Sequence, residues 1–141
     1  MIVSHVIGLF FAALTIIIHY EALRMLSLRV VERAGLPRLK TLLTVFSIFV
    51  VHVIEVWLFA GGLYLGSVHF GLGELQGNFS GSVRDYAYFS AVVYTSLGFG
   101  DIFPVSELRV IVAYESIIGL LMMAWSAAFT FHFMQRHWQG S

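Results

Sequence analysis

The stretch from Thr95 to Asp101, TSLGFGD, places two hydroxyls, two glycines and an acid inside an otherwise apolar chain. The glycines at 98 and 100 permit backbone angles that other residues resist, so consecutive carbonyl groups can turn toward one side. Irregular backbone in a membrane is tolerated only where it is buried in protein or lines a wet cavity. Both conditions are met if several copies face each other around an axis. Their oxygens would then form stacked rings that replace the hydration shell of a cation.

The composition indicates a membrane protein. Hydrophobic residues make up 59% of the 141 residues and charged residues only 11%, whereas soluble domains carry about a quarter charged residues. The formal net charge of zero gives no basic field for nucleic acid, so no nucleic-acid partner is expected. The absence of cysteine excludes disulfides, thiolate metal sites and thiol catalysis.

Three apolar stretches approach the roughly 20 residues that a helix needs to cross a bilayer. They run from Ile2 to Tyr20, from Leu42 to Leu65 and from Val110 to Met134. The segment between the first two is rich in Arg and Lys, so the positive-inside rule predicts that it is cytoplasmic. This places the N-terminus outside and the C-terminus in the cytoplasm. Gly35 and Pro37 predict a break in any helix that continues from the first span.

A shorter apolar run, DYAYFSAVVYT at 85–95, lies between the second and third stretches. At about eleven residues it is too short to span a membrane, which predicts a re-entrant helix. Ser82 and Asp85 have the spacing of a capping-box variant at its start. Its C-terminal end, with roughly half a negative charge, would point toward the membrane centre and run directly into TSLGFGD. The glycine-rich segment before it is predicted to be a surface loop.

Between these elements, TSLGFGD resembles the selectivity filter of potassium channels, whose usual form is TVGYG. Pro104 and Gly119, which matches the family's usual hinge position in the last helix, extend the resemblance. It implies an all-α membrane protein with three transmembrane helices, a re-entrant pore helix and a filter loop, assembled as a homotetramer in the lipid bilayer. Residues 41–138 would form the pore domain. Residues 1–40 would add an N-terminal transmembrane helix and a basic cytoplasmic linker.

The resemblance assigns the ion-binding filter to Thr95, Ser96, Leu97, Gly98, Phe99, Gly100 and Asp101. K⁺ would be the permeating ligand, held by oxygens of Ser96, Leu97, Gly98 and Phe99, and no cofactor is expected. Ser96, Leu97 and Phe99 stand where the family most often has Thr, Val and Tyr. Tyr88 stands at the position of a family Trp, and we expect its hydroxyl to bond Asp101.

The last helix carries a stripe of residues at helical spacing. Gly119, Leu120, Met123, Ala127 and Phe131 form this set, which the resemblance assigns to the hinge, the cavity and the gate. Packing between helices is the alternative explanation. Ala127 would leave a water-filled cavity, and Phe131 would form a hydrophobic constriction that closes by dewetting.

Ionisable residues inside a span are functional hypotheses by default. Glu55 lies in the middle of the second span, and His52 one turn earlier shares its face. The two form a structural pair, a metal site or, with Glu115, a proton sensor. We expect Glu115 to anchor the filter region, with Tyr94 or Thr95 as alternative partners.

We therefore expect a channel that passes K⁺ down its gradient, located in a bacterial inner membrane. A weakly selective Na⁺/K⁺ channel is the first alternative. The second is a membrane haem or metal protein that uses His19, His52, His132 or His137. Against it, His52 is placed in mid-membrane, whereas His19 and His132 are placed near one edge. Ser, His and Asp occur in no arrangement that implies a nucleophile with a base, so no enzyme is expected.

Overall fold

The computed structural model describes residues 1–31 and 37–138. Long helices form α1 (Ile2–Val31), α2 (Pro37–Tyr64) and α4 (Leu108–Trp138). A π-helical turn, η1 (Leu65–His69), continues α2. The short elements between α2 and α4 are β1 (Leu75–Gly77), α3 (Val83–Tyr94) and β2 (Ile102–Pro104).

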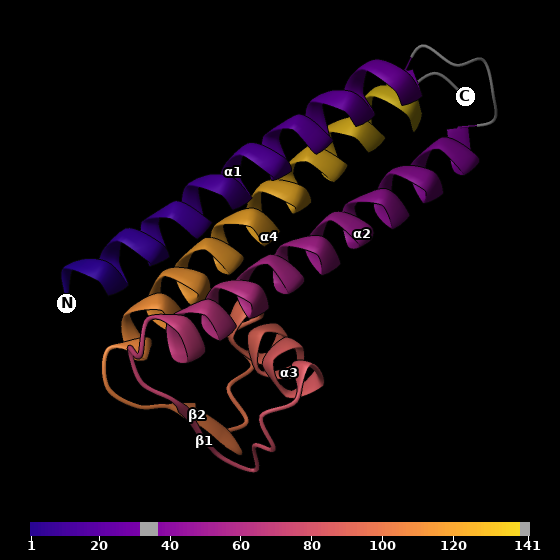
Figure 1. Cartoon of the computed structure of the whole chain (residues 1–141). Helices are drawn as coiled ribbons and strands as arrows, with labels where there is room; N and C mark the ends of the chain where they lie inside the picture. Colours follow the sequence, from indigo (N-terminus) through magenta and orange to yellow (C-terminus); the bar gives the residue numbers. More distant parts are fainter. Residues whose placement is uncertain (32–36, 139–141) are drawn as a thin grey trace.

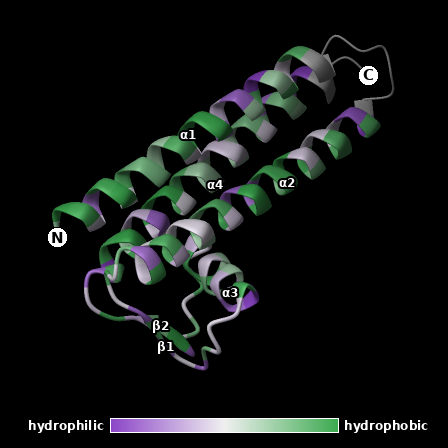
Figure 2. Ribbon diagram, in the orientation of Figure 1, coloured by the Kyte–Doolittle hydropathy of each residue, from purple (hydrophilic) through white to green (hydrophobic). Residues whose placement is uncertain are grey.

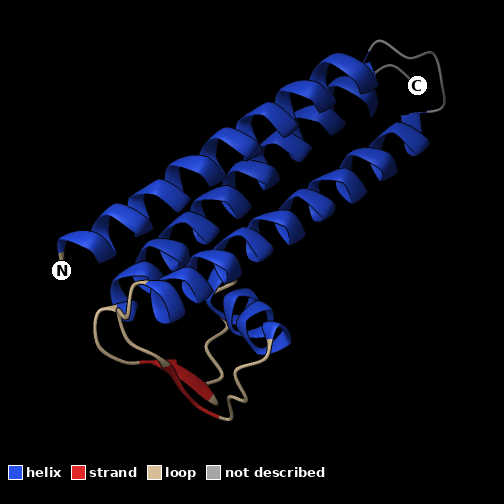
Figure 3. Ribbon diagram, in the orientation of Figure 1, coloured by secondary structure: helices blue, strands red, loops and turns tan. Residues whose placement is uncertain are grey.

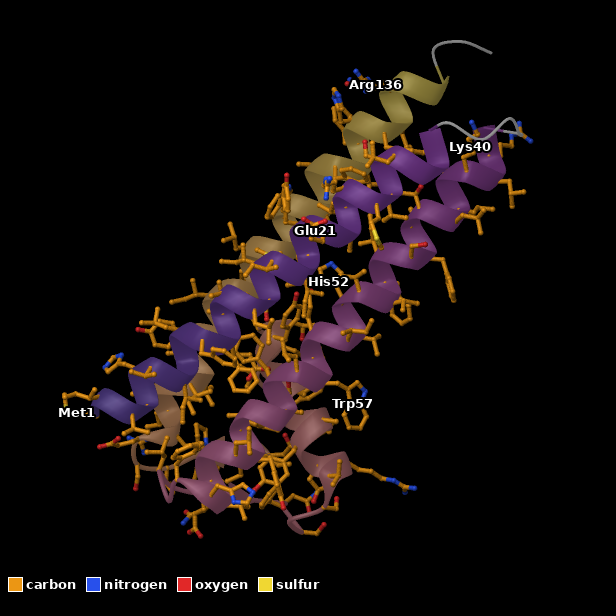
Figure 4. All side chains as sticks on the ribbon, turned by 45° about the horizontal axis from the view of Figure 1, so that its top comes forward. Met1, Glu21, Lys40, His52, Trp57 and Arg136 are labelled. Carbon is orange, nitrogen blue, oxygen red and sulfur yellow. The ribbon has the colours of Figure 1, made fainter. Side chains whose placement is uncertain are left out.

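The three long helices lie side by side, and each contacts the other two (Figure 1). The short helix α3 packs against α2 and α4 at one end of this bundle. Met1 lies at the end that carries α3 and the strands, whereas Lys40 and Arg136 lie at the other end (Figure 4). The filter stretch and the basic end of the molecule are therefore separated by the length of the bundle.

Hydropathy confirms the all-α membrane fold. Among the described residues, three helices are long and apolar enough to cross a membrane: Ile2–Leu28, Arg38–His69 and Leu108–Arg136. Figure 2 shows their mostly hydrophobic residues and a more polar end around the strands. Large apolar side chains on the outside, such as Phe10, Phe46 and Trp57, are half or more exposed. Such a surface is stable in lipid and not in water.

The helices are longer than the apolar stretches predicted. Most of the expected basic loop is helical, because α1 continues to Val31 and α2 already begins at Pro37. Pro is well suited to the first position of a helix. Of the two residues that predicted a break, Pro37 begins α2, whereas Gly35 lies outside the described residues.

The predicted surface loop before α3 contains structure that the sequence did not reveal. Its strand β1 pairs antiparallel with β2, which follows the filter stretch, with Gln76 opposite Phe103 (Figure 3). Asn78 N–H also donates to the backbone oxygen of Asp101 at 2.8 Å. This ribbon ties the chain before α3 to the chain after the filter stretch.

The apolar core surrounds α3. One cluster packs Tyr86 and Phe89 of α3 against residues such as Leu63 and Ile111. A second cluster brings together all four helices through Phe11, Phe59, Tyr94, Ile118 and Met122. Only α1, α2 and α4 run the length of the bundle, so this core fixes the short helix from several sides.

Gly119 allows the closest approach in this core. A Cβ at this position of α4 would overlap the backbone oxygen of Tyr94, the last residue of α3. Gly61 of α2 is different, because a Cβ there would meet no atom within 4 Å. Gly119, at the family's usual hinge position, is therefore also needed for the close packing of α4 against α3.

We expect Gly119→Ala to lower the free energy of unfolding by about 1–3 kcal/mol, the usual cost of overpacking. The matched control Gly61→Ala should leave it unchanged or raise it by up to about 1 kcal/mol, because Ala is the better helix former. Thermal unfolding of the detergent-solubilised protein measures both. Equal unfolding temperatures for the two variants would contradict the close approach.

Candidate functional site: the filter stretch and its supports

The helix α3 begins with a side-chain cap. The Ser82 hydroxyl accepts from the Asp85 N–H at 3.2 Å, as the capping-box spacing predicted. The Asp85 carboxylate accepts from the backbone N–H and the hydroxyl of Ser80 at 2.7 and 2.6 Å. These bonds from Ser80 lower the pKa of Asp85. A charged acid in the first turn suits the helix dipole.

The filter stretch begins as the C-terminal cap of α3. Ser96 N–H donates to the Val93 oxygen and Leu97 N–H to the Val92 oxygen, both at 2.9 Å. This pair of bonds is the Schellman motif, which requires a left-handed residue after the helix. Ser96 meets that requirement with φ 57°. A left-handed residue other than glycine costs roughly 1–2 kcal/mol, and the capped carbonyls offset that cost.

The same hydrogen bonds set the direction of the filter carbonyls. Leu97 N–H points back to Val92, and Gly98 N–H also reaches that oxygen at 3.4 Å. In a trans peptide the C=O points opposite to the N–H. The carbonyls of Ser96 and Leu97 therefore point away from α3.

The left-handed conformation recurs at every second residue of the stretch. Ser96, Gly98 and Gly100 have φ values of 57°, 58° and 78°, and the residues between them have no positive φ. Alternation of this kind turns successive peptide groups to one side. Residues 95–100 are all exposed in the single chain, with Leu97 and Phe99 exposed by 58% and 65%. The structure thus presents the backbone of this stretch, with the Ser96 and Leu97 oxygens directed away from α3, on an open face.

A family model described as "Ion channel" matches residues 39–136. The chain belongs to this family. The resemblance to the potassium channel pore domain is confirmed at the level of the family, and α1 is an additional apolar helix outside the matched segment. Neither a curated protein nor a solved structure gave a significant match.

In this ion channel, the far end of the filter stretch is braced as the sequence predicted. The Tyr88 hydroxyl donates to the Asp101 carboxylate at 3.0 Å. This hydrogen bond raises the pKa of Tyr88 because the neutral phenol is the donor. At the near end, the hydroxyls of Ser96 and Ser116 lie 3.2 Å apart. Both ends of the stretch are therefore attached to helices.

The predicted stripe on α4 lies partly on an open face. Leu120 and Phe131 are exposed by 53% and 63%. Ala127 is exposed and Met123 half-buried. Gly119 belongs to the buried side, against α3. The assignment of these residues to a cavity and gate stays a prediction.

Five polar side chains from all four helices meet behind α3. Glu55 accepts from the Tyr94 hydroxyl at 2.6 Å, and its oxygens lie 2.9 and 3.1 Å from Nδ1 of His19 and His52. The Ser126 hydroxyl lies 3.2 and 3.0 Å from Nε2 of the same two histidines. The predicted contact between His52 and Glu55 is confirmed. Their role as proton sensors with Glu115 is not tested by these contacts and stays a prediction.

The placement of His19 near the membrane edge was wrong. Its side chain is fully buried, and its ring centroid lies 5.3 Å from that of His52. His52 itself lies in the middle of the bundle, between the ends that carry Met1 and Arg136 (Figure 4). Because α1 continues to Val31, residue 19 is near the middle of the helix and not near its end.

Glu115 anchors α3 from α4, through a partner that the sequence did not indicate. Tyr94 and Thr95 bond elsewhere, and Glu115 Oε1 is hydrogen-bonded to the Ser90 hydroxyl. That hydroxyl also lies 2.7 Å from the Val56 backbone oxygen, which can only accept. A hydroxyl has one hydrogen, so Ser90 donates to Val56 and Glu115 donates to Ser90 as a neutral acid.

We expect Glu115→Gln to change the free energy of unfolding by less than about 1 kcal/mol, because the amide can still donate to Ser90. Glu115→Ala should cost about 2–4 kcal/mol, because it leaves a cavity and removes that donor. Thermal or denaturant unfolding in detergent compares the two variants. A Gln variant as unstable as the Ala variant would mean that Glu115 is charged in the folded protein.

Proposed function

We propose that the chain forms a K⁺-selective pore as a homotetramer. Family membership establishes ion transport as the coarser function. The alternation of left-handed residues at 96, 98 and 100 carries the finer proposal. This alternation is consistent with a row of backbone oxygens that faces away from the capped end of α3.

The exposure of this row supports assembly around an axis. Irregular backbone inside a bilayer needs protein or a wet cavity around it, and residues 95–100 have neither in one chain. Four copies would surround the axis with these residues. Leu97 and Phe99 would then pack against neighbouring copies, which replaces the hydrogen-bonded bracing that Tyr supplies in the family's usual filter.

In the assembled pore, K⁺ would exchange its hydration shell for the oxygens of Ser96, Leu97, Gly98 and Phe99. K⁺ is then a permeating ligand, and no resident cofactor is required. The exposed side of α4, with Leu120, Met123, Ala127 and Phe131, would line the cavity below. Phe131 is the proposed constriction.

The orientation follows from charge. Lys40 and Arg136 lie at the end of the bundle opposite to α3 (Figure 4), and the positive-inside rule assigns that end to the cytoplasm. The N-terminus and the filter's Asp101 end would face outward. A bacterial inner membrane is the proposed location.

Flux into liposomes tests the selectivity of the proposed filter. With purified protein, we expect K⁺ flux that Ba²⁺ blocks and much smaller Na⁺ flux. Gly98→Ala should abolish this selective flux, because φ 58° strains any residue with a Cβ. Gly61→Ala is the matched control and should behave as the wild type, because space is free around residue 61.

Equal flux of K⁺ and Na⁺ through the wild type would refute K⁺ selectivity and favour the weakly selective channel. Selective flux that survives Gly98→Ala would refute the proposed role of the backbone alternation. The control at Gly61 separates this effect from a general loss of folding.

Single cysteines test the orientation, since the chain has none of its own. Asn78 and Gln135 are both exposed and lie before α3 and near the end of α4. In intact cells, a membrane-impermeant maleimide should label Asn78→Cys and leave Gln135→Cys unlabelled until the cells are lysed. The reverse pattern would invert the proposed topology.

A further inference from the structure

Two histidines and one carboxylate meet in the middle of the bundle in a pattern that pore formation does not require. Nitrogen atoms of His19 and His52 and an oxygen of Glu55 all lie within 4.8 Å of one another. His19 comes from α1, and the other two come from adjacent turns of α2. His19 and Glu55 are fully buried, and His52 is largely buried. Imidazole nitrogen and carboxylate oxygen are the ligands that Zn²⁺ takes in proteins.

The hydroxyl of Ser126 orients both rings. It lies within 3.2 Å of Nε2 of His19 and of His52, so the two rings share one partner on the side away from Glu55. A hydroxyl oxygen accepts two hydrogen bonds but donates only one. If both Nε2 atoms carry hydrogen, Ser126 accepts from both. Metal-bound histidines characteristically use their second ring nitrogen in this way.

This arrangement leaves three acceptors pointing at one place. With hydrogen on Nε2, the Nδ1 lone pairs of His19 and His52 both face the carboxylate of Glu55, at 2.9 and 3.1 Å. Three lone-pair groups at such distances repel unless a cation lies among them. In the reverse tautomers, with hydrogen on Nδ1, the single hydrogen of Ser126 leaves one Nε2 without a donor. Mixed tautomers satisfy the cluster without an ion: His19 donates from Nδ1 to Glu55 and accepts from Ser126, whereas His52 donates from Nε2 to Ser126 and has the Tyr94 hydroxyl 2.9 Å from its Nδ1. With hydrogen on both Nε2 atoms, the three lone-pair groups are instead arranged to hold a cation.

We propose that this cluster, His19, His52 and Glu55, binds a divalent transition-metal ion of the Zn²⁺ type. The Tyr94 hydroxyl, 2.9 Å from His52 Nδ1, is a neighbouring oxygen that completes the set. Tyr94 is also the last residue of α3, so its side chain connects that helix to the site. The carboxylate of Glu55 offsets part of the charge of the ion.

The ion joins α1 to the pore at a specific point. Glu55 and His52 belong to the segment matched by the ion channel family, whereas His19 belongs to the helix outside it. Tyr94 immediately precedes the filter stretch. A bound ion would hold three helices together one residue away from Thr95. The inference rests on these contacts and not on potassium selectivity.

Metal binding by the purified full-length protein in detergent tests this site. Zn²⁺ titration by calorimetry should give one ion per chain, and Co²⁺ should give visible absorption that Zn²⁺ displaces. His19→Ala should abolish stoichiometric binding. Ser126→Ala, a small change, should weaken binding by roughly 10- to 100-fold, the usual effect of losing a group that orients a ligand. His132→Ala, an exposed histidine of α4, is the matched control and should bind as the wild type does.

A thermal measurement keeps the test valid if a variant folds poorly. Zn²⁺ should raise the unfolding temperature of the wild type and of His132→Ala, because an ion that binds only the folded state stabilises it. It should not raise that of His19→Ala. Wild-type binding no tighter than that of His19→Ala, or unchanged binding in Ser126→Ala, would overturn the proposal. The first outcome would mean that the cluster is held by hydrogen bonds alone.

Discussion

Hydrocarbon offers no hydrogen-bonding partner, and α3 ends where the filter stretch must begin. The last carbonyls of a helix have no partner inside the helix. Here Val92 and Val93 accept from the N–H groups of Ser96, Leu97 and Gly98. Those bonds turn the attached carbonyls of Ser96 and Leu97 away from α3. The same hydrogen bonds therefore cap α3 and set the direction of the first filter oxygens.

The capped end is useful only if α3 cannot slide. Apolar packing alone permits small shifts, whereas buried hydrogen bonds specify one position. Two such contacts hold α3: Tyr94 donates to Glu55 of α2, and Ser90 bonds both Val56 and Glu115. The close approach of Gly119 fixes the distance to α4. The ribbon of β1 and β2 then holds the chain on the other side of the filter stretch.

Length and composition made much of this fold predictable. Apolar stretches of spanning length indicate the long helices, and the short run at 85–95 indicates a helix that cannot cross. The contact of Tyr88 with Asp101 followed from family positions. The ribbon was missed because its two strands have only three residues each, too few to show an alternating pattern. The left-handed Ser96 was missed because the capping bonds of α3, and not the residue type, determine its conformation.

The position of His19 in the middle of the bundle was also not predicted, because it too depends on more than the local sequence. Hydropathy falls after Tyr20, where Glu21 and Arg24 occur, and so the apolar stretch ends before the helix does. These two side chains pair with each other at 2.9 Å on the exposed side of the continuing helix. A residue that lies at the edge of an apolar stretch can thus lie in the middle of a helix. The partner contacts of a buried histidine cannot be inferred from one sequence, because they depend on which helices are adjacent.

Tyr94 is the residue through which the polar cluster reaches the filter stretch. Its hydroxyl donates to Glu55, its backbone lies against Gly119, and the next residue is Thr95. Glu55 has two oxygens, and the histidines of α1 and α2 use both. An ion bound between these histidines would compete with Tyr94 for the same carboxylate. The added helix α1 therefore contacts the filter support chemically, through His19, as well as by packing.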